Sequence, residues 1–213
     1  MGYEIARALL SIDAVMIRPD EPFIWASGIK SPIYCDNRLT LSAPEVRVKI
    51  ENSLAQLIKE KFPECEVLMG TSTAGIPHAA IVGHILGLPM GYVRGSAKDH
   101  GKKNQIEGKL QKGAKTVVVE DLISTGGSVL EVVDVLRKEG ADVLGVVSIF
   151  TYNMKKGLER LKEENVVNYS LTNLDELAAA AAEDGIISEK DIKRILAFRD
   201  NPSDESWIKG DVL

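Results

Sequence analysis

Hydrophobic residues recur along this chain with helical and strand-like periods in turn, which predicts a succession of helices and strands. Residues 3–17 have the pattern of an amphipathic helix and its exit. Residues 44–61 carry apolar side chains at helical spacing, and Pro44 suits the first turn of that helix. Short apolar runs typical of buried strands occupy residues 65–69, 89–93, 116–119 and 143–150. From residue 155 onward the pattern predicts only helices.

Strands that alternate with helices predict an α/β fold with a mostly parallel central sheet flanked by helices. Residues 23–38 break this alternation, because Trp25 and Tyr34 flank Ser-Gly and Ser-Pro pairs that are typical of a hairpin. We expect one domain over residues 1–213. Its parts are a small N-terminal hood (about 1–40), a core (about 44–155) and a C-terminal helical part (155–213).

The segment 116–130 differs from an ordinary strand and helix. Its strand, residues 116–119, ends on two adjacent acids, Glu120 and Asp121, and a polar loop over residues 124–128 precedes the next helix. A glycine-rich loop lets backbone N–H groups converge, and the helix N-terminus adds positive potential, so such a turn can hold a phosphate. The acids would repel that phosphate, so they are expected to face sugar hydroxyls or a bound cation.

The polar loop before the helix also fits a purely structural role. Taken alone, a short Gly/Ser turn is more often a helix cap than a ligand site. The adjacent acids favour a ribose 5-phosphate cradle. A second Gly/Thr-rich turn, residues 70–77, follows another strand, and open α/β folds bind ligands at the carboxyl edge where two such turns meet.

A long polar loop over residues 94–108 follows the strand at 89–93. It contains five cationic or imidazole side chains, Arg94, Lys98, His100, Lys102 and Lys103. Loops of this length in a compact domain are usually functional lids or disordered segments. A solvated basic surface and a segment that closes on a polyanion explain its composition equally well.

Composition indicates the class of protein, its partners and its cellular compartment. Of its 213 residues, 45% are hydrophobic and 27% charged, as in ordinary soluble proteins. A net charge of −5 and an isoelectric point near 5.4 argue against a large nucleic-acid footprint. Two cysteines are too few for a disulfide framework, and no apolar run is long enough for a bilayer. We therefore expect a cytoplasmic protein with neither nucleic-acid nor membrane partners.

Residues 116–128 resemble the phosphoribosyl pyrophosphate (PRPP) signature of type I phosphoribosyltransferases. In that signature an apolar strand, two acids and two spacer residues precede Ser/Thr, Thr, Gly, Gly and Ser/Thr, and Glu120 here replaces a frequent Asp. The resemblance implies a type I phosphoribosyltransferase-like fold and Mg²⁺ as cofactor, bound mainly through PRPP near the two acids. It also implies PRPP contacts from Glu120, Asp121, Leu122, Ile123, Ser124, Thr125, Gly126, Gly127 and Ser128.

Two further segments are similar to orotate phosphoribosyltransferases in particular. The Ser-Gly-x-Lys-Ser-Pro run at residues 27–32 is similar to the hood that covers the base, and the Lys-Asp-His element of the basic loop resembles the catalytic loop. By this resemblance Arg94, Lys98 and His100 are pyrophosphate ligands that act in catalysis together with Asp121. The loop is then shared across the interface of a homodimer.

The chain departs from these relatives where they carry cations. Ala26 and Ala74 stand where some members have Lys, and Tyr152 with Asn153 stands where many have an Arg that meets the orotate carboxylate. Ser124 and backbone groups of the hood are the remaining candidates for orotate binding.

The resemblance implies transfer of ribose 5-phosphate from PRPP to orotate, giving orotidine 5′-monophosphate and pyrophosphate in de novo pyrimidine (UMP) biosynthesis. A purine phosphoribosyltransferase is an alternative enzyme, and a PRPP-sensing regulator that binds nucleic acid is an alternative from another class. The spacing in the basic loop argues against the purine enzyme, and the acidic isoelectric point argues against the regulator.

Overall fold

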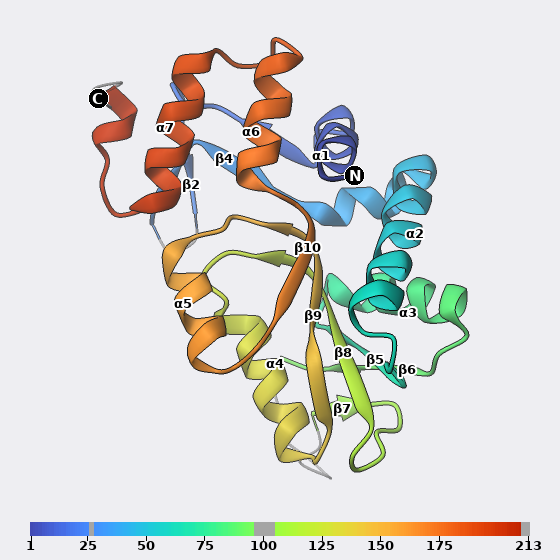
Figure 1. Cartoon of the computed structure of the whole chain (residues 1–213). Coiled ribbons are helices and arrows are strands. Elements are labelled where there is room, and N and C mark those ends of the chain that lie inside the picture. The colour runs from blue at the N-terminus through green and yellow to red at the C-terminus, as the bar shows by residue number, and fades with distance from the viewer. Residues whose placement is uncertain (26–27, 96–104, 210–213) are drawn as a thin grey trace.

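The computed structural model describes residues 1–25, 28–95 and 105–209. At its centre lies a six-stranded sheet with the strand order β10-β9-β8-β5-β6-β7, in which all neighbours are parallel except the short antiparallel strand β7 (Figure 1). The strands are β5 (Val67–Thr71), β6 (Met90–Val93), β7 (Ile106–Glu107), β8 (Lys115–Ile123), β9 (Asp142–Thr151) and β10 (Asn168–Asn173). The predicted α/β fold with a mostly parallel sheet is confirmed.

Helices cover both faces of this sheet because its central strands are apolar on both sides. Val117 and Val119 point into the larger hydrophobic cluster, and Val118, between them, points into the smaller one. The larger cluster is covered by α1 (Gly2–Ser11), α2 (Pro44–Lys61), α3 (Gly75–Leu86), α6 (Leu174–Glu183) and α7 (Glu189–Asp200). The smaller is covered by α4 (Gly127–Lys138) and α5 (Lys155–Glu163).

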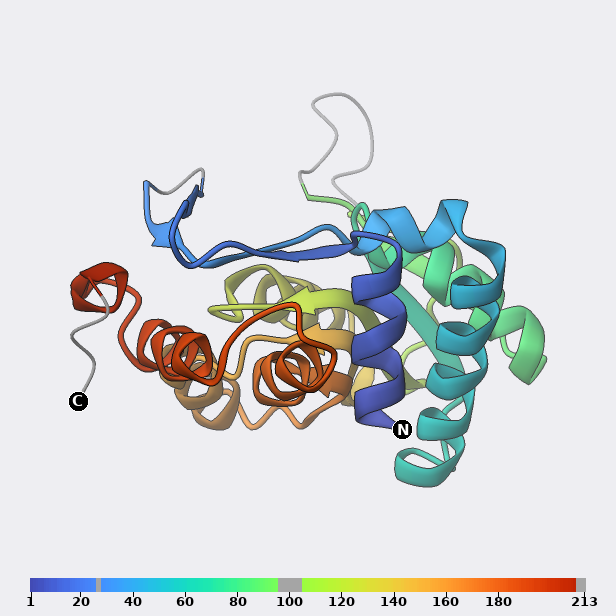
Figure 2. The same cartoon turned by 90° about the horizontal axis from the view of Figure 1, so that it is seen from above.

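Four short strands and a 3₁₀ helix form the hood. Strands β1 (Val15–Ile17) and β4 (Ile33–Cys35) pair antiparallel, as do β2 (Phe23–Ile24) and β3 (Lys30–Ser31), which confirms the predicted hairpin. Figure 2 shows these strands running from the end of α1 toward α7. The 3₁₀ helix η1 (Asn37–Ser42) then leads back to α2.

A row of edge-to-face aromatic contacts joins the hood to the sheet and to the C-terminal part. Trp25 of the hood lies 5.4 Å from Tyr152, directly after β9, and 5.7 Å from Phe198 of α7, measured between ring centroids. Phe198 in turn contacts Trp207 of the 3₁₀ helix η2 (Ser206–Lys209), with 5.7 Å between their centroids. Such pairs stabilise beyond the area they bury.

The buried side chain of Arg194 makes a second connection between the hood and the C-terminal part. Its guanidinium donates to the carbonyl oxygens of Pro19 at 2.7 Å and Trp207 at 2.9 Å, and to Asp20 Oδ1 at 2.7 Å. The guanidinium has five donors in one plane and can bond several acceptors at once, so one residue of α7 holds both segments in place.

No helix among the described residues is long and apolar enough to cross a membrane.

Two predictions from the hydrophobic pattern were wrong in detail. The strand predicted for residues 116–119 does not end on the acids, because Glu120, Leu122 and Ile123 continue to pair with β9. The chain from residue 155 onward is not only helical, since β10 pairs with β9 there. Polar side chains such as Ser170 hid this strand in the pattern. The proposed boundaries within a single domain stay a prediction.

A buried polar pair joins α2 to α3. Glu51 Oε1 lies 2.6 Å from Nδ1 of His78, and both side chains are no more than 1% exposed. The second oxygen of Glu51 and Nε2 of His78 have no hydrogen-bond partner among the described residues. Each group therefore depends on the other, because a buried polar group without a partner is costly.

Replacing Glu51 with Ala should lower the free energy of unfolding by about 2–4 kcal/mol, because His78 stays buried without its partner. Urea denaturation followed by circular dichroism measures this loss. Glu60 lies on the same helix but is exposed, where it accepts a hydrogen bond from Gln56. Glu60→Ala should cost less than about 0.5 kcal/mol, and equal losses for the two variants would contradict the assigned role.

Candidate active site

The candidate site lies at the carboxyl edge of the sheet, where β5 and β8 are direct parallel neighbours. Thr71 ends β5, and its hydroxyl donates a 2.6 Å hydrogen bond to Glu120 Oε1 on β8. The loop 72–74 after β5 and the loop 124–128 after β8 therefore leave the sheet side by side. This is the arrangement expected for a ligand site in an open α/β sheet.

Glu120 is a buried carboxyl group, with 5% of its surface exposed. Burial raises the pKa of Glu120 to about 8, and the neighbouring Asp121 is the second cause of this rise. The hydrogen bond from Thr71 lowers the pKa, but by less. The backbone N–H of Asp121 also donates to Glu120 Oε1 at 2.9 Å. Two hydrogen bonds thus hold this carboxyl group at the end of β8.

Asp121 connects β8 to the hood. The side-chain amide of Asn37, at the start of η1, donates to the carbonyl oxygen of Asp121 at 2.8 Å. The thiol of Cys35 donates to Asn37 Oδ1 at 3.3 Å, which orients that amide. The side chain of Asp121 is half-buried, so it is more accessible than that of Glu120.

The loop after β8 turns at a left-handed glycine. Gly126 has φ of 74° and is the N-cap of α4, which begins at Gly127. Ser124 and Thr125 are half-buried and Ser128 is exposed, and no acid lies in the first turn of α4. The free N–H groups and the positive end of this helix therefore meet no competing carboxylate within its own first turn.

The second loop lies close against β8. A Cβ atom on Gly75, at the start of α3, would lie 2.3 Å from the carbonyl oxygen of Val119, so only glycine fits there. The peptide bond between Ser72 and Thr73 in this loop is cis. Ala74 is the N-cap of α3, so the backbone of the loop supplies the polar groups at this point.

Arg94 follows β6 and stands beside both loops. A small cavity of about 80 Å³ is lined by Arg94 together with Thr71, Ser72, Val93, Gly95, Gln105, Ser128, Glu131, Val132 and Val135. Nη1 of Arg94 is buried without a hydrogen-bond partner in the described part of the chain, and lies 3.7 Å from Glu107 Oε1. Lys98 and His100, with Lys102 and Lys103, lie outside the described residues.

The phosphoribosyl transferase domain family matches residues 40–179, which include both loops and both acids. The orotate phosphoribosyltransferase of Bacillus anthracis is 57% identical over 208 residues, which span 98% of this chain and 99% of that relative. The chain belongs to the orotate phosphoribosyltransferase family.

Solved structures agree with this membership of the orotate phosphoribosyltransferase family. The orotate phosphoribosyltransferase of Aeropyrum pernix is similar with a TM-score of 0.74 and 28% identity, covering 86% of this chain and 99% of that one. The UMP synthase of Leishmania donovani shares the fold, with a TM-score of 0.80 and 24% identity over 92% of this chain and 42% of that one. The predicted type I phosphoribosyltransferase-like fold is confirmed.

Tyr152 directly follows β9, near the position where the resemblance to orotate phosphoribosyltransferases implies an Arg. Its ring packs between Phe150 and Trp25, and its backbone N–H donates to the carbonyl oxygen of Ile123 at 2.9 Å. Burial raises the pKa of its hydroxyl well above the usual range. The residue therefore supports the hood as a neutral aromatic side chain, through its contact with Trp25.

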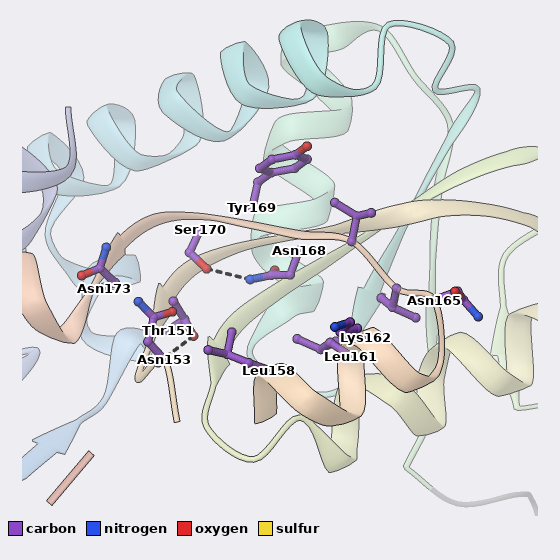
Figure 3. A pocket seen from close by; sticks show the side chains of 12 residues that line it. Thr151, Asn153, Leu158, Leu161, Lys162, Asn165, Asn168, Tyr169, Ser170 and Asn173 are labelled. Carbon is purple, nitrogen blue, oxygen red and sulfur yellow. Dashed lines mark hydrogen bonds between the residues drawn. The ribbon is translucent and has the colours of Figure 1, made fainter. Parts of the chain in front are cut away.

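A cleft of about 600 Å³ opens between β9, β10 and α5 (Figure 3). Asn168 and Ser170 point into it from β10, with a 2.9 Å hydrogen bond from Asn168 Nδ2 to Ser170 Oγ. Ser170 Oγ is also 2.6 Å from Ser148 Oγ on β9. These groups satisfy one another, so the polar wall of this cleft is explained by the pairing of β10 with β9.

The structure thus places Arg94 beside Ser128 and beside Thr71, whose hydroxyl is bonded to Glu120. Asp121, Leu122 and Ile123 lie with Glu120 in β8, directly before the loop 124–128. Two residues of the site were missed from the sequence, Thr71 and Asn37. Thr71 belongs to a run rich in threonine, but only the pairing of β5 with β8 selects it as the partner of Glu120. No local pattern indicates the contact of Asn37 with Asp121, 84 positions away.

The raised pKa of Glu120 makes stability depend on pH. Between the unfolded pKa of 4.5 and the folded pKa of about 8, the unfolded chain loses its proton at this group while the folded chain keeps it, so stability falls as pH rises. Glu120→Gln keeps an acceptor for Thr71 but has no proton to lose. The unfolding free energy of the natural protein should therefore fall relative to this variant by a few kcal/mol between pH 5 and pH 8.

Urea denaturation of both proteins across this pH range measures the difference. Glu131→Gln, at an exposed position of α4, is the control and should show a nearly constant offset from the natural protein. A constant offset for Glu120→Gln as well would show that Glu120 is ionised in the folded protein and would contradict the assignment.

Proposed function

We propose that this protein transfers ribose 5-phosphate from PRPP to orotate, giving orotidine 5′-monophosphate and pyrophosphate in pyrimidine biosynthesis. The observation that carries the proposal is the 57% identity, over nearly its full length, to a protein named orotate phosphoribosyltransferase. The two adjacent acids and the glycine loop at the start of α4 support it chemically, because together they suit a phosphorylated sugar.

In the proposed complex the 5-phosphate of PRPP binds the backbone of residues 124–128. Thr125, Gly126, Gly127 and Ser128 offer N–H groups around the N-terminus of α4, and Ser124, Thr125 and Ser128 add hydroxyls. The carboxylate of Asp121 accepts hydrogen bonds from the ribose hydroxyls. Glu120 supports Asp121 from the buried side, and Leu122 and Ile123 keep the acids at a fixed distance from the loop.

Mg²⁺ fits this donor set only as a partner of PRPP. No three metal-binding side chains gather among the residues that the structure describes, so the protein alone offers too few ligands for an octahedral ion. Glu120 and Asp121 offer oxygen ligands, which Mg²⁺ prefers, and substrate phosphates and water complete such sites. The ion would add positive charge where the pyrophosphate group leaves.

The chain's own cations complete the proposed chemistry. Arg94, Lys98 and His100 bind the pyrophosphate group and neutralise the charge that grows on it as its bond to ribose breaks. Orotate is already an anion, so its attacking nitrogen needs no dedicated base, and positioning supplies most of the remaining acceleration. Ser124 is proposed to contact orotate together with backbone groups of the hood.

The protein is proposed to act as a cytoplasmic homodimer in which each subunit's basic loop, with Arg94, Lys98 and His100, serves the partner's site. The free cysteines Cys35 and Cys65 are consistent with a reducing compartment.

A direct assay tests the function. With PRPP and Mg²⁺ present, the protein should consume orotate, measured by loss of its ultraviolet absorbance, and should leave adenine, hypoxanthine and uracil unchanged. Chelation by EDTA should abolish the reaction, and added Mg²⁺ should restore it. Consumption of a purine instead of orotate would overturn the proposed substrate, and full activity in EDTA would overturn the role of the ion.

Mixing two inactive variants tests the shared loop. Lys98→Ala and Asp121→Asn should each have little activity alone, because one removes a pyrophosphate ligand and the other a ribose ligand. A mixed dimer then contains one site with both defects and one with neither, so random exchange should restore up to about a quarter of the natural activity.

The control for this mixing experiment combines two loop variants, Lys98→Ala and His100→Ala. Their mixed dimers have a defect at both sites, so no activity should return. If verified exchange between Lys98→Ala and Asp121→Asn also restores nothing, the loop acts within its own subunit.

A further inference from the structure

The segment that follows β9 lies directly against the loop that follows β8. Tyr152 N–H donates to the carbonyl oxygen of Ile123, and α5 begins three residues later at Lys155. Figure 1 shows α5 beside the start of α4. The first turns of α5 are therefore the support behind the candidate phosphate loop, on the side away from the hood.

Gly157, in the first turn of α5, touches this loop through its backbone. A Cβ atom on Gly157 would lie 2.4 Å from the carbonyl oxygen of Ser124, a distance that real Cβ atoms do not adopt. The nearest neighbour of a Cβ on Gly126 would be the carbonyl oxygen of Gly157, at 3.6 Å. A glycine is needed at residue 157 because two backbones meet there.

Arg160 contacts the same loop one turn further along α5. Its Nη1 atom lies 3.4 Å from the carbonyl oxygen of Thr125, as a long hydrogen bond. Arg160 is also the one cation among the described residues that line the groove of about 480 Å³ between α4 and α5. The rest of that lining consists of Gly127, Leu130, Glu131, Asp134, Glu163 and Glu164.

These contacts decide which way the loop amides point. In a planar trans peptide the C=O and the following N–H point in opposite directions. Because the carbonyl groups of Ser124 and Thr125 face α5, the N–H groups of Thr125 and Gly126 face away from it. Those are the donors that a phosphate at the start of α4 needs.

We propose that Gly157 and Arg160 are positioning residues that hold the loop 124–128 with its amides turned toward the 5-phosphate of the substrate. Gly157 allows the close approach, and Arg160 anchors the Thr125 carbonyl group while its charge offsets the carboxylates of the groove. The inference deepens the proposed function and rests on it, since it concerns the same phosphate site.

Gly157→Ala tests the close approach. The methyl group displaces the Ser124 carbonyl group, so the KM for PRPP should rise at least about tenfold. The matched control is Gly145→Ala on β9, where a Cβ would lie 2.6 Å from the ring of Phe62, at the end of the strand away from the site. Both variants should lose stability, but only Gly157→Ala should lose affinity for PRPP.

Arg160→Gln tests the anchor and keeps the inference testable if Gly157→Ala does not fold. It should raise the KM for PRPP about fivefold to tenfold, and Arg160→Lys, which keeps the charge, should recover part of the loss. The matched control is Arg137→Gln. Arg137 joins the same two helices at their other end, where it donates to the carbonyl oxygens of Glu164 at 2.9 Å and Asn165 at 3.3 Å.

Calorimetric titration with ribose 5-phosphate gives a readout without turnover. Its Kd should rise for Gly157→Ala and Arg160→Gln and stay unchanged for Gly145→Ala and Arg137→Gln. Equal effects in variants and controls would overturn the positioning role. If the natural protein binds ribose 5-phosphate but consumes no orotate, the proposed function fails, and the same titrations still decide the role of Gly157 and Arg160.

Discussion

The direct pairing of β5 with β8 is the constraint on which the candidate site depends. It places two loops at one edge, and the hydrogen bond from Thr71 to Glu120 joins the strands where those loops begin. The contact of Gly75 with the Val119 carbonyl group then fixes α3 against β8. With Gly157 against Ser124 on the other side, the site is enclosed by backbone contacts in which a side chain would not fit.

The hood depends on elements that lie far from it in the sequence. Asn37 joins the hood to β8 by a hydrogen bond to the Asp121 carbonyl oxygen. Trp25 joins its outer part to Tyr152 and Phe198 by aromatic contacts. Arg194 holds the turn at Pro19 against η2. The C-terminal helix α7 and the 3₁₀ helix η2 therefore contribute to holding the hood in place.

Local patterns predicted the parts of the fold that local physics determines. The apolar runs identified the buried strands, and the glycine loops identified the edge where they meet, because each signal lies within a few adjacent residues. Strand β10 was missed because Asn168 and Ser170 face polar partners on β9 rather than the core. The sequence also did not predict the roles of four residues, Thr71, Asn37, Gly157 and Arg160. Each contacts a residue 33 to 84 positions away, and only the folded chain brings those pairs together.

Two acids beside the candidate phosphate loop oppose the binding of a polyanion. Burial resolves part of this conflict, because a pKa of about 8 keeps Glu120 largely neutral at pH 7 and removes one negative charge from the edge of the site. In the proposed complex, a cation that arrives with the substrate would favour the charged form of a nearby carboxyl group and would lower the pKa of Glu120. Under the proposed function, the cost of burying Glu120 would then be a reason for substrate and cation to bind together.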